Sequence, residues 1–110
     1  MFHDILLTKK EFERLLVAYP ERIPVIVNID SKLNVTLDKR KYLTPKDLTL
    51  GQFTSVIRKR VNLAPEEALI VFSDKTLLCQ SSTMSVLQSC YPEKITGFLC
   101  LTYMAEDVFG

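Results

Sequence analysis

Three cysteines are the most reactive side chains in the sequence, and their spacing decides what chemistry they could do. Cys79, Cys90 and Cys100 are odd in number and form no CxxC pair, which argues against a disulfide framework or a zinc site. A nucleophilic cysteine needs an activating neighbour such as histidine, and the single histidine is His3, near the N-terminus. We therefore expect three reduced thiols, with Cys100 buried in a strand like a small apolar residue.

Other signatures of catalysis are also missing from the sequence. It has no pair of carboxylates that suggests a shared site and no cluster of metal ligands. A glycine-rich phosphate loop is excluded, because the chain contains only three glycines. An enzyme is therefore the least favoured class, and we predict no catalytic residue, no cofactor and no bound metal.

Basic side chains are concentrated in one stretch of the chain. Residues 38–60 contain seven Lys or Arg against Asp38 and Asp47, a charge of +5, whereas the whole chain is +1, which leaves −4 elsewhere. One face should therefore attract acidic partners or anionic lipid. Nucleic acid is disfavoured as a partner, because the chain has no tryptophan and no aromatic platform among these cations.

Length and composition predict one soluble globular domain. The 110 residues suffice for one domain and are too few for two. Hydrophobic residues make up 47% and charged residues 25%, which is the balance of a chain with a packed core. The apolar runs are too short to cross a bilayer, and the N-terminus lacks the layout of a signal peptide, so we expect a cytoplasmic protein.

The hydrophobic pattern predicts two main helices and a short third one at 83–90. Thr8 followed by Glu11 is typical of a capping box, and Pro20 should end the helix that it opens. The apolar stripe of this first helix is Phe12, Leu15, Leu16 and Tyr19. Thr49 is a natural N-cap for the second helix, whose apolar residues at helical spacing are Leu50, Phe53, Val56, Ile57 and Val61.

Short runs of β-branched and apolar residues predict four strands, at 22–29, 41–44, 69–73 and 98–103. Residues 30–38 are predicted to form a loop, and Asp74-Lys75 a turn. The order of elements is that of a ubiquitin-like β-grasp domain, an α+β fold with a mixed four-stranded sheet crossed by a helix. We expect a helical extension at 1–21, the β-grasp domain at 22–103 and an exposed tail at 104–110.

Three segments carry a resemblance to a known family. They read YPERIPVIV (19–27), KRKYLTPKDLTLGQFTSVIRKR (39–60) and GFLCLTYMAEDVFG (97–110). Together, and at this separation, they closely resemble the autophagy ubiquitin-like modifiers of the GABARAP and light-chain-three group. The resemblance runs from about Tyr19 to Gly110.

The resemblance implies lipid conjugation through Gly110. In the family an activating enzyme adenylates the terminal glycine carboxylate, and a thioester delivers it through a conjugating enzyme to phosphatidylethanolamine on autophagosomal membranes. A dedicated cysteine protease processes or releases family members, which are monomers before conjugation. Glycine suits this chemistry, because without a Cβ its carbonyl is open to an attacking amine. The residues alone also allow a frayed terminus without function at Gly110.

Two departures from the family pattern bear on these expectations. Family precursors usually carry residues beyond the glycine, and this sequence has none. Family members usually have two helices before the segment that starts at Tyr19, whereas only eighteen residues precede Tyr19 here. We therefore expect a shortened helical extension, and any membrane-tethering or tubulin-binding role of this arm is not carried over.

The resemblance also implies a groove for short linear motifs of cargo receptors. A peptide with an aromatic residue and, three positions later, an aliphatic one would add a strand beside the second strand of the sheet. The first pocket would use Glu11, Leu15, Pro24, Ile26, Lys41, Leu43 and Phe98. The second would use Tyr42, Thr44, Pro45, Leu48, Phe53 and Val56. Acidic flanks of the peptide would meet Lys39, Lys41 and Arg60.

Other interpretations of these residues stay open. On periodicity alone, four pocket residues could be ordinary core: Ile26, Leu48, Phe53 and Val56. The cations at 39–41 could simply protect a strand edge. We expect Thr44 to alter partner preference, since burying an unpaired hydroxyl costs about 1–3 kcal/mol. A ubiquitin-like docking adaptor that is never conjugated, or a microtubule-binding module, are the alternative functions.

Overall fold

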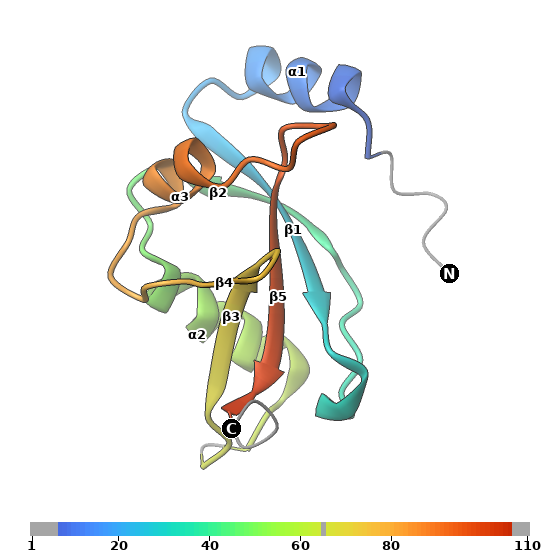
Figure 1. Cartoon of the computed structure of the whole chain (residues 1–110), viewed down its shortest axis with the longest axis vertical. Helices are drawn as coiled ribbons and strands as arrows, with labels where there is room; N and C mark the ends of the chain where they lie inside the picture. Colours follow the sequence, from blue (N-terminus) through green and yellow to red (C-terminus); the bar gives the residue numbers. More distant parts are fainter. Residues whose placement is uncertain (1–6, 65, 107–110) are drawn as a thin grey trace.

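The structure is a computed structural model, which describes residues 7–64 and 66–106 (Figure 1). Within these residues, three α-helices and five strands follow one another, with a short 3-10 turn after the first strand. They are α1 (Lys9–Ala18), β1 (Arg22–Ile29), η1 (Ser31–Leu33), β2 (Lys41–Pro45), α2 (Leu50–Val61), β3 (Leu69–Ser73), β4 (Thr76–Leu77), α3 (Met84–Cys90) and β5 (Leu99–Ala105). This is the α+β, ubiquitin-like arrangement that the sequence predicts.

The strands form one mixed sheet in the order β2-β1-β5-β3-β4. β1 and β5 run parallel in its interior, and the other neighbouring strands pair antiparallel. The prediction of four strands was wrong by one. β4 has two residues and forms because the chain turns at Asp74, whose φ is 57°, and brings Leu77 back beside Phe72. A strand this short leaves no periodic pattern in the sequence.

Side-chain caps begin the two longer helices, as the sequence predicts. The Thr49 hydroxyl accepts from the Gln52 amide while the Gln52 side chain accepts from the Thr49 amide, a complete capping box at α2. At α1 only half of the box forms. The Thr8 hydroxyl accepts from the Glu11 amide at 3.0 Å, but the Glu11 carboxylate turns to Arg14 and Lys41 instead.

Each face of the sheet carries its own apolar layer. The larger core lies between the sheet and α2, where alternate residues of β1 and β5 meet the buried face of that helix. Its fully buried members include Val25, Leu50, Ile57, Leu101 and Tyr103. On the opposite face α1 packs near the start of β1 (Figure 1), and a smaller cluster forms from Phe12, Leu15, Ile26 and Phe98.

One helix and one strand differ from the prediction, in the apolar face of α1 and in the end of β5. α1 buries Phe12 and Leu15 but leaves Leu16 38% and Tyr19 46% exposed, so its apolar stripe is narrower than predicted. β5 continues past Tyr103 to Ala105, which pairs with Leu69 and is 5% exposed. The first residues of the predicted tail therefore belong to the sheet. Among the described residues, no helix combines the length and apolar character needed to cross a membrane.

Candidate functional site

β2 is an outer strand of the sheet, as the predicted groove requires. It pairs antiparallel with β1, with Thr44 opposite Ile23 and Lys41 opposite Ile26, and within the described residues it has no second partner strand. The backbone along its outer edge is therefore open to another extended chain. Because side chains alternate along a strand, successive residues of β2 face the α1 side and the α2 side in turn.

The residues predicted for the first pocket come together on the α1 side. Leu15 from α1, Ile26 from β1 and Phe98 share one buried cluster, against which Leu43 packs from β2. Pro24 lies opposite Leu43 in the strand register. Leu15, Ile26 and Phe98 are at most 4% exposed, so they form the floor of this region. Leu43 is half-buried and lies nearer to solvent.

Glu11 joins this cluster as its acidic member. Its carboxylate accepts from Nε and Nη2 of Arg14 at 2.7 and 2.8 Å and from Nζ of Lys41 at 3.3 Å. The Arg14 guanidinium above all, and then the Lys41 ammonium, hold the pKa of Glu11 at about 2, although its desolvation raises it. One carboxylate thus joins α1 to the strand at the sheet edge, beside the predicted first pocket.

Phe12 belongs to the same cluster, although the sequence did not indicate it as a candidate site residue. Its ring meets Phe98 edge-on with centroids 5.2 Å apart, and it also lies against Gly97. A Cβ at position 97 would approach two Phe12 ring atoms at 2.8 Å, and Gly97 has φ of 95°. The spacing of Phe12 and Leu15 places both residues on one face of the helix. This spacing is the feature of the sequence that could have identified Phe12.

Apart from Pro45 at the end of β2, the residues predicted for the second pocket lie on the α2 side, where they differ widely in exposure. Tyr42 and Phe53 meet edge-on with centroids 5.4 Å apart and are buried. Leu48 packs partly buried against the main core. Val56 is 43% exposed, and Pro45 is exposed at the end of β2. Phe53 is thus core, whereas Val56 offers apolar surface that a ligand could cover.

Thr44 differs from its expected state. Its hydroxyl donates to the carbonyl oxygen of Ile23 at 3.2 Å, and the residue is 4% exposed. The expectation of an unpaired hydroxyl was therefore wrong, because the neighbouring strand supplies an acceptor. The predicted desolvation cost for a ligand in this pocket loses its physical basis, although Thr44 does lie in β2, opposite Ile23.

The three cations predicted to meet the acidic flank of a peptide have different partners in the structure. Lys41 faces Glu11, as described above. Lys39 Nζ lies 5.2 Å from the centroid of the Tyr42 ring, and Arg60 Cζ lies 5.7 Å from it. The Tyr42 hydroxyl donates to the Lys39 carbonyl at 2.6 Å, and burial raises the pKa of the Tyr42 phenol. Lys39 and Arg60 therefore gather around one ring beside the predicted groove.

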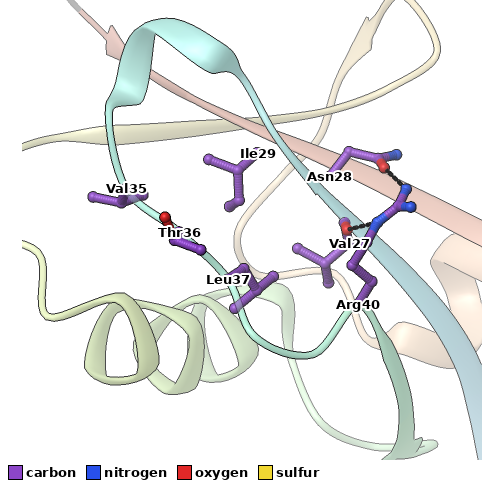
Figure 2. A pocket seen from close by; sticks show the side chains of 7 residues that line it. All are labelled: Val27, Asn28, Ile29, Val35, Thr36, Leu37 and Arg40. Atoms are coloured by element: carbon purple, nitrogen blue, oxygen red, sulfur yellow. Dashed lines mark hydrogen bonds between the residues drawn. The ribbon is translucent and has the colours of Figure 1, made fainter. Parts of the chain in front are cut away.

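Arg40 turns away from this gathering and holds the end of β1. Its Nε donates to the Val27 carbonyl at 3.3 Å, and its Nη2 donates to Asn28 Oδ1 (Figure 2). The guanidinium borders a pocket of about 280 Å³, whose lining is Val27, Asn28, Ile29, Val35, Thr36, Leu37 and Arg40. This cation therefore supports the chain between β1 and β2. The net charge of +5 over residues 38–60 thus includes a side chain that already has partners within the fold.

The three cysteines form no disulfide in the described part of the chain. Cys79 and Cys90 are exposed, whereas Cys100 is partly buried in β5 and packs against the α1-side cluster. Burial raises the pKa of the Cys100 thiol to about 11, and hydrogen bonding to Ser81 lowers the pKa of Cys79. No group of three potential metal ligands occurs in the described part of the chain. Gly110, the predicted conjugation site, lies outside the described residues.

Comparison with known proteins identifies relatives along nearly the whole chain. The family described as autophagy protein Atg8, ubiquitin-like, matches residues 8–110. Autophagy-related protein 8 of Mycosarcoma maydis is 43% identical over 109 residues, covering 98% of this chain and 92% of the relative. Autophagy-related protein 8 of Schizosaccharomyces pombe is 44% identical over 103 residues, covering 93% and 84% of the two chains.

Solved structures agree with these sequence matches. Trypanosoma brucei ATG8 superposes with a TM-score of 0.80 at 37% identity, over 89% of this chain and 84% of that one. Plasmodium falciparum Atg8, solved in complex with a Plasmodium falciparum Atg3 peptide, has the same fold, with a TM-score of 0.74 at 23% identity over 86% and 85%. The chain therefore belongs to the Atg8 family of autophagy ubiquitin-like proteins, the GABARAP and light-chain-three type that its sequence resembles.

Proposed function

We propose that this chain is a ubiquitin-like modifier of autophagy, conjugated through Gly110 to phosphatidylethanolamine on autophagosomal membranes. The family match supports this most directly, because it extends through residue 110 and so includes the Phe109-Gly110 end. The chain moves in this proposal from the cytoplasm to the autophagosomal membrane when it is lipidated. It contributes an acyl group and has no catalytic role of its own.

The conjugation would proceed in four steps. ATP converts the Gly110 carboxylate to an acyl adenylate and releases pyrophosphate. A thiol of the activating enzyme displaces AMP, and the acyl group passes to a thiol of the conjugating enzyme. The amine of phosphatidylethanolamine then attacks the thioester, which forms an amide and frees the thiol. A glycine at the reacting position leaves the carbonyl uncrowded, because it has no side chain. A cysteine protease would hydrolyse the amide to release the chain.

The second half of the proposal is a peptide groove along the outer edge of β2. A short linear motif of a cargo receptor would pair its backbone with that edge. Its aromatic residue would lie on the α1 side, over Leu43 and the cluster below it, and its aliphatic residue on the α2 side near Val56. Lys39 and Arg60, around the Tyr42 ring, would meet its acidic flank. That Plasmodium falciparum Atg8 binds an Atg3 peptide supports peptide docking in this fold.

Reconstitution tests conjugation directly. Purified chain is incubated with the activating and conjugating enzymes of the family, ATP and liposomes that contain phosphatidylethanolamine. We expect a mass increase equal to the lipid minus water, and we expect Gly110→Ala to abolish it while the circular dichroism spectrum is unchanged. An unmodified wild-type chain that still binds aromatic-x-x-aliphatic peptides would instead support the adaptor that is never conjugated.

A further inference from the structure

Asp38 forms an ion pair with Arg60, which lies over the Tyr42 ring beside the predicted groove. It lies in the bend that leads into β2, and its Oδ1 is 3.5 Å from Nη2 of Arg60 in the last turn of α2. The two side chains are exposed, at 76% for Asp38 and 38% for Arg60. An ion pair this open to water can be exchanged for another one at small cost. Asp38 therefore pairs with Arg60, a cation that the carboxylate of another molecule could also reach.

Tyr42 fixes the place of that cation. Arg60 lies over the Tyr42 ring, and Lys39 lies within cation–π distance of the same ring. Edge-on packing against Phe53 and a hydrogen bond to the Lys39 carbonyl hold the ring itself. Arg60 thus has two partners of different kinds, a ring that stays in the core and a carboxylate in solvent. Only the carboxylate can be replaced without disturbing the fold.

We propose that Asp38 is an internal competitor for the acidic flank of a bound peptide. In the free protein it neutralises Arg60, and a peptide carboxylate binds Arg60 by displacing it. This inference rests on the proposed peptide groove and adds the residue that sets its preference for acidic peptides. Peptides without acidic flanks do not use Arg60 and are indifferent to Asp38, apart from the general effect of charge.

The competitor has a matched control in the same segment. Asp47 is also exposed, and among the described residues it has no ion pair. Asp38→Asn and Asp47→Asn therefore change the net charge equally, and only the first releases Arg60. The test uses the full chain and two synthetic peptides with one aromatic-x-x-aliphatic core, preceded by three Glu in one peptide and by three Gln in the other. Isothermal titration at low and at physiological salt measures the four variant–peptide pairs and the wild type.

Asp38→Asn should tighten binding of the Glu peptide about two- to fivefold beyond its effect on the Gln peptide, the range that exposed ion pairs allow. Asp47→Asn should raise the affinity for the Glu peptide less, and its remaining effect should vanish with salt. In an Arg60→Gln background, Asp38→Asn should have no effect beyond that of Asp47→Asn. This last comparison separates the release of Arg60 from the general effect of removing one negative charge.

Each other result overturns the proposal, in ways that can be told apart. If the two Asp variants change the affinity for the Glu peptide equally, the effect comes from net charge alone and Asp38 is no competitor. The proposed groove would be unaffected by that result. Weaker binding by Asp38→Asn would mean that Asp38 supports the bound state. If the wild type binds neither peptide, the groove fails and the competitor fails with it.

Discussion

The carboxylate of Glu11 in α1 lies 3.3 Å from Nζ of Lys41 in β2, so one ion pair joins the helix on the sheet to the strand at its edge. Arg14 binds the same carboxylate from one turn further along α1. Glu11 is 7% exposed, whereas Lys41 is 30% and Arg14 is 61% exposed. Because the acid is the common partner, its protonation removes both ion pairs, and we expect the stability of the fold to depend on pH for this reason.

Glu11→Gln should remove a contribution to stability that depends on pH in a defined window. The pKa of Glu11 is about 2 in the folded protein, below its ordinary value of 4.5. A lowered folded pKa stabilises the fold fully above the unfolded pKa, and this stabilisation is lost as pH falls through the folded pKa. Wild type should therefore exceed Glu11→Gln in unfolding free energy at pH 7, and the difference should shrink between pH 4.5 and 2. Urea unfolding at several pH values measures it.

Glu13→Gln is the matched control for that series. Glu13 is exposed on the same helix, and no ion pair of Glu13 occurs among the described residues. Its substitution removes the same charge and should leave the pH dependence nearly that of wild type. Parallel curves for wild type and Glu11→Gln down to pH 2 would show that the charge of Glu11 makes no pH-dependent contribution to stability.

Gly97→Ala should destabilise the fold by about 1–3 kcal/mol, the usual cost of an L side chain in a strained backbone conformation. The added Cβ would also meet the Phe12 ring at 2.8 Å. Gly51→Ala is the control for backbone conformation, because Gly51 lies in α2 without positive φ, although its added Cβ would make a tight contact of 3.3 Å with the Gln80 carbonyl oxygen. Alanine also favours the helix there. Similar losses in urea unfolding for both variants would contradict this account of Gly97.

The sequence predicts what is local in this fold, together with what the family motif carries. The N-cap residue Thr49 and the β-branched run of β1 identify their elements, because each element follows from neighbouring residues. The motif also placed Leu43 and Tyr42 correctly on the edge strand. It could not identify Phe12, whose role follows from packing against Gly97, a residue far away in the chain.

Two further features depend on tertiary contacts and left no signal in the sequence. The pairing of Asp38 with Arg60 requires the bend before β2 to meet the end of α2. The hydroxyl of Thr44 gains its acceptor only because β1 lies beside β2 in the observed register. Charge counts and hydropathy patterns describe neither case, since both depend on which residues the fold brings together.

Thr44→Val should lower the unfolding free energy by about 0.5–1.5 kcal/mol, the usual net contribution of one hydrogen bond. The variant keeps the shape of the side chain and removes the donor to the Ile23 carbonyl, in a site that is 4% exposed. Thr76→Val, at an exposed position in β4, should change the unfolding free energy by less than about 0.5 kcal/mol. If urea unfolding shows Thr44→Val as stable as wild type, the hydrogen bond contributes nothing net.

The three thiols should react with iodoacetamide at pH 8 in an order set by pKa and exposure. The thiolate is the reacting form. Cys79 is exposed and its pKa is lowered by the nearby Ser81 hydroxyl, so it should be alkylated first. Cys100 should be slowest, because burial raises its pKa to about 11 and also limits access. Peptide mapping by mass spectrometry gives the three rates, and in urea they should converge, since the fold alone separates them. Early alkylation of Cys100 in the native protein would mean that β5 opens readily, and that the α1-side cluster does not protect it.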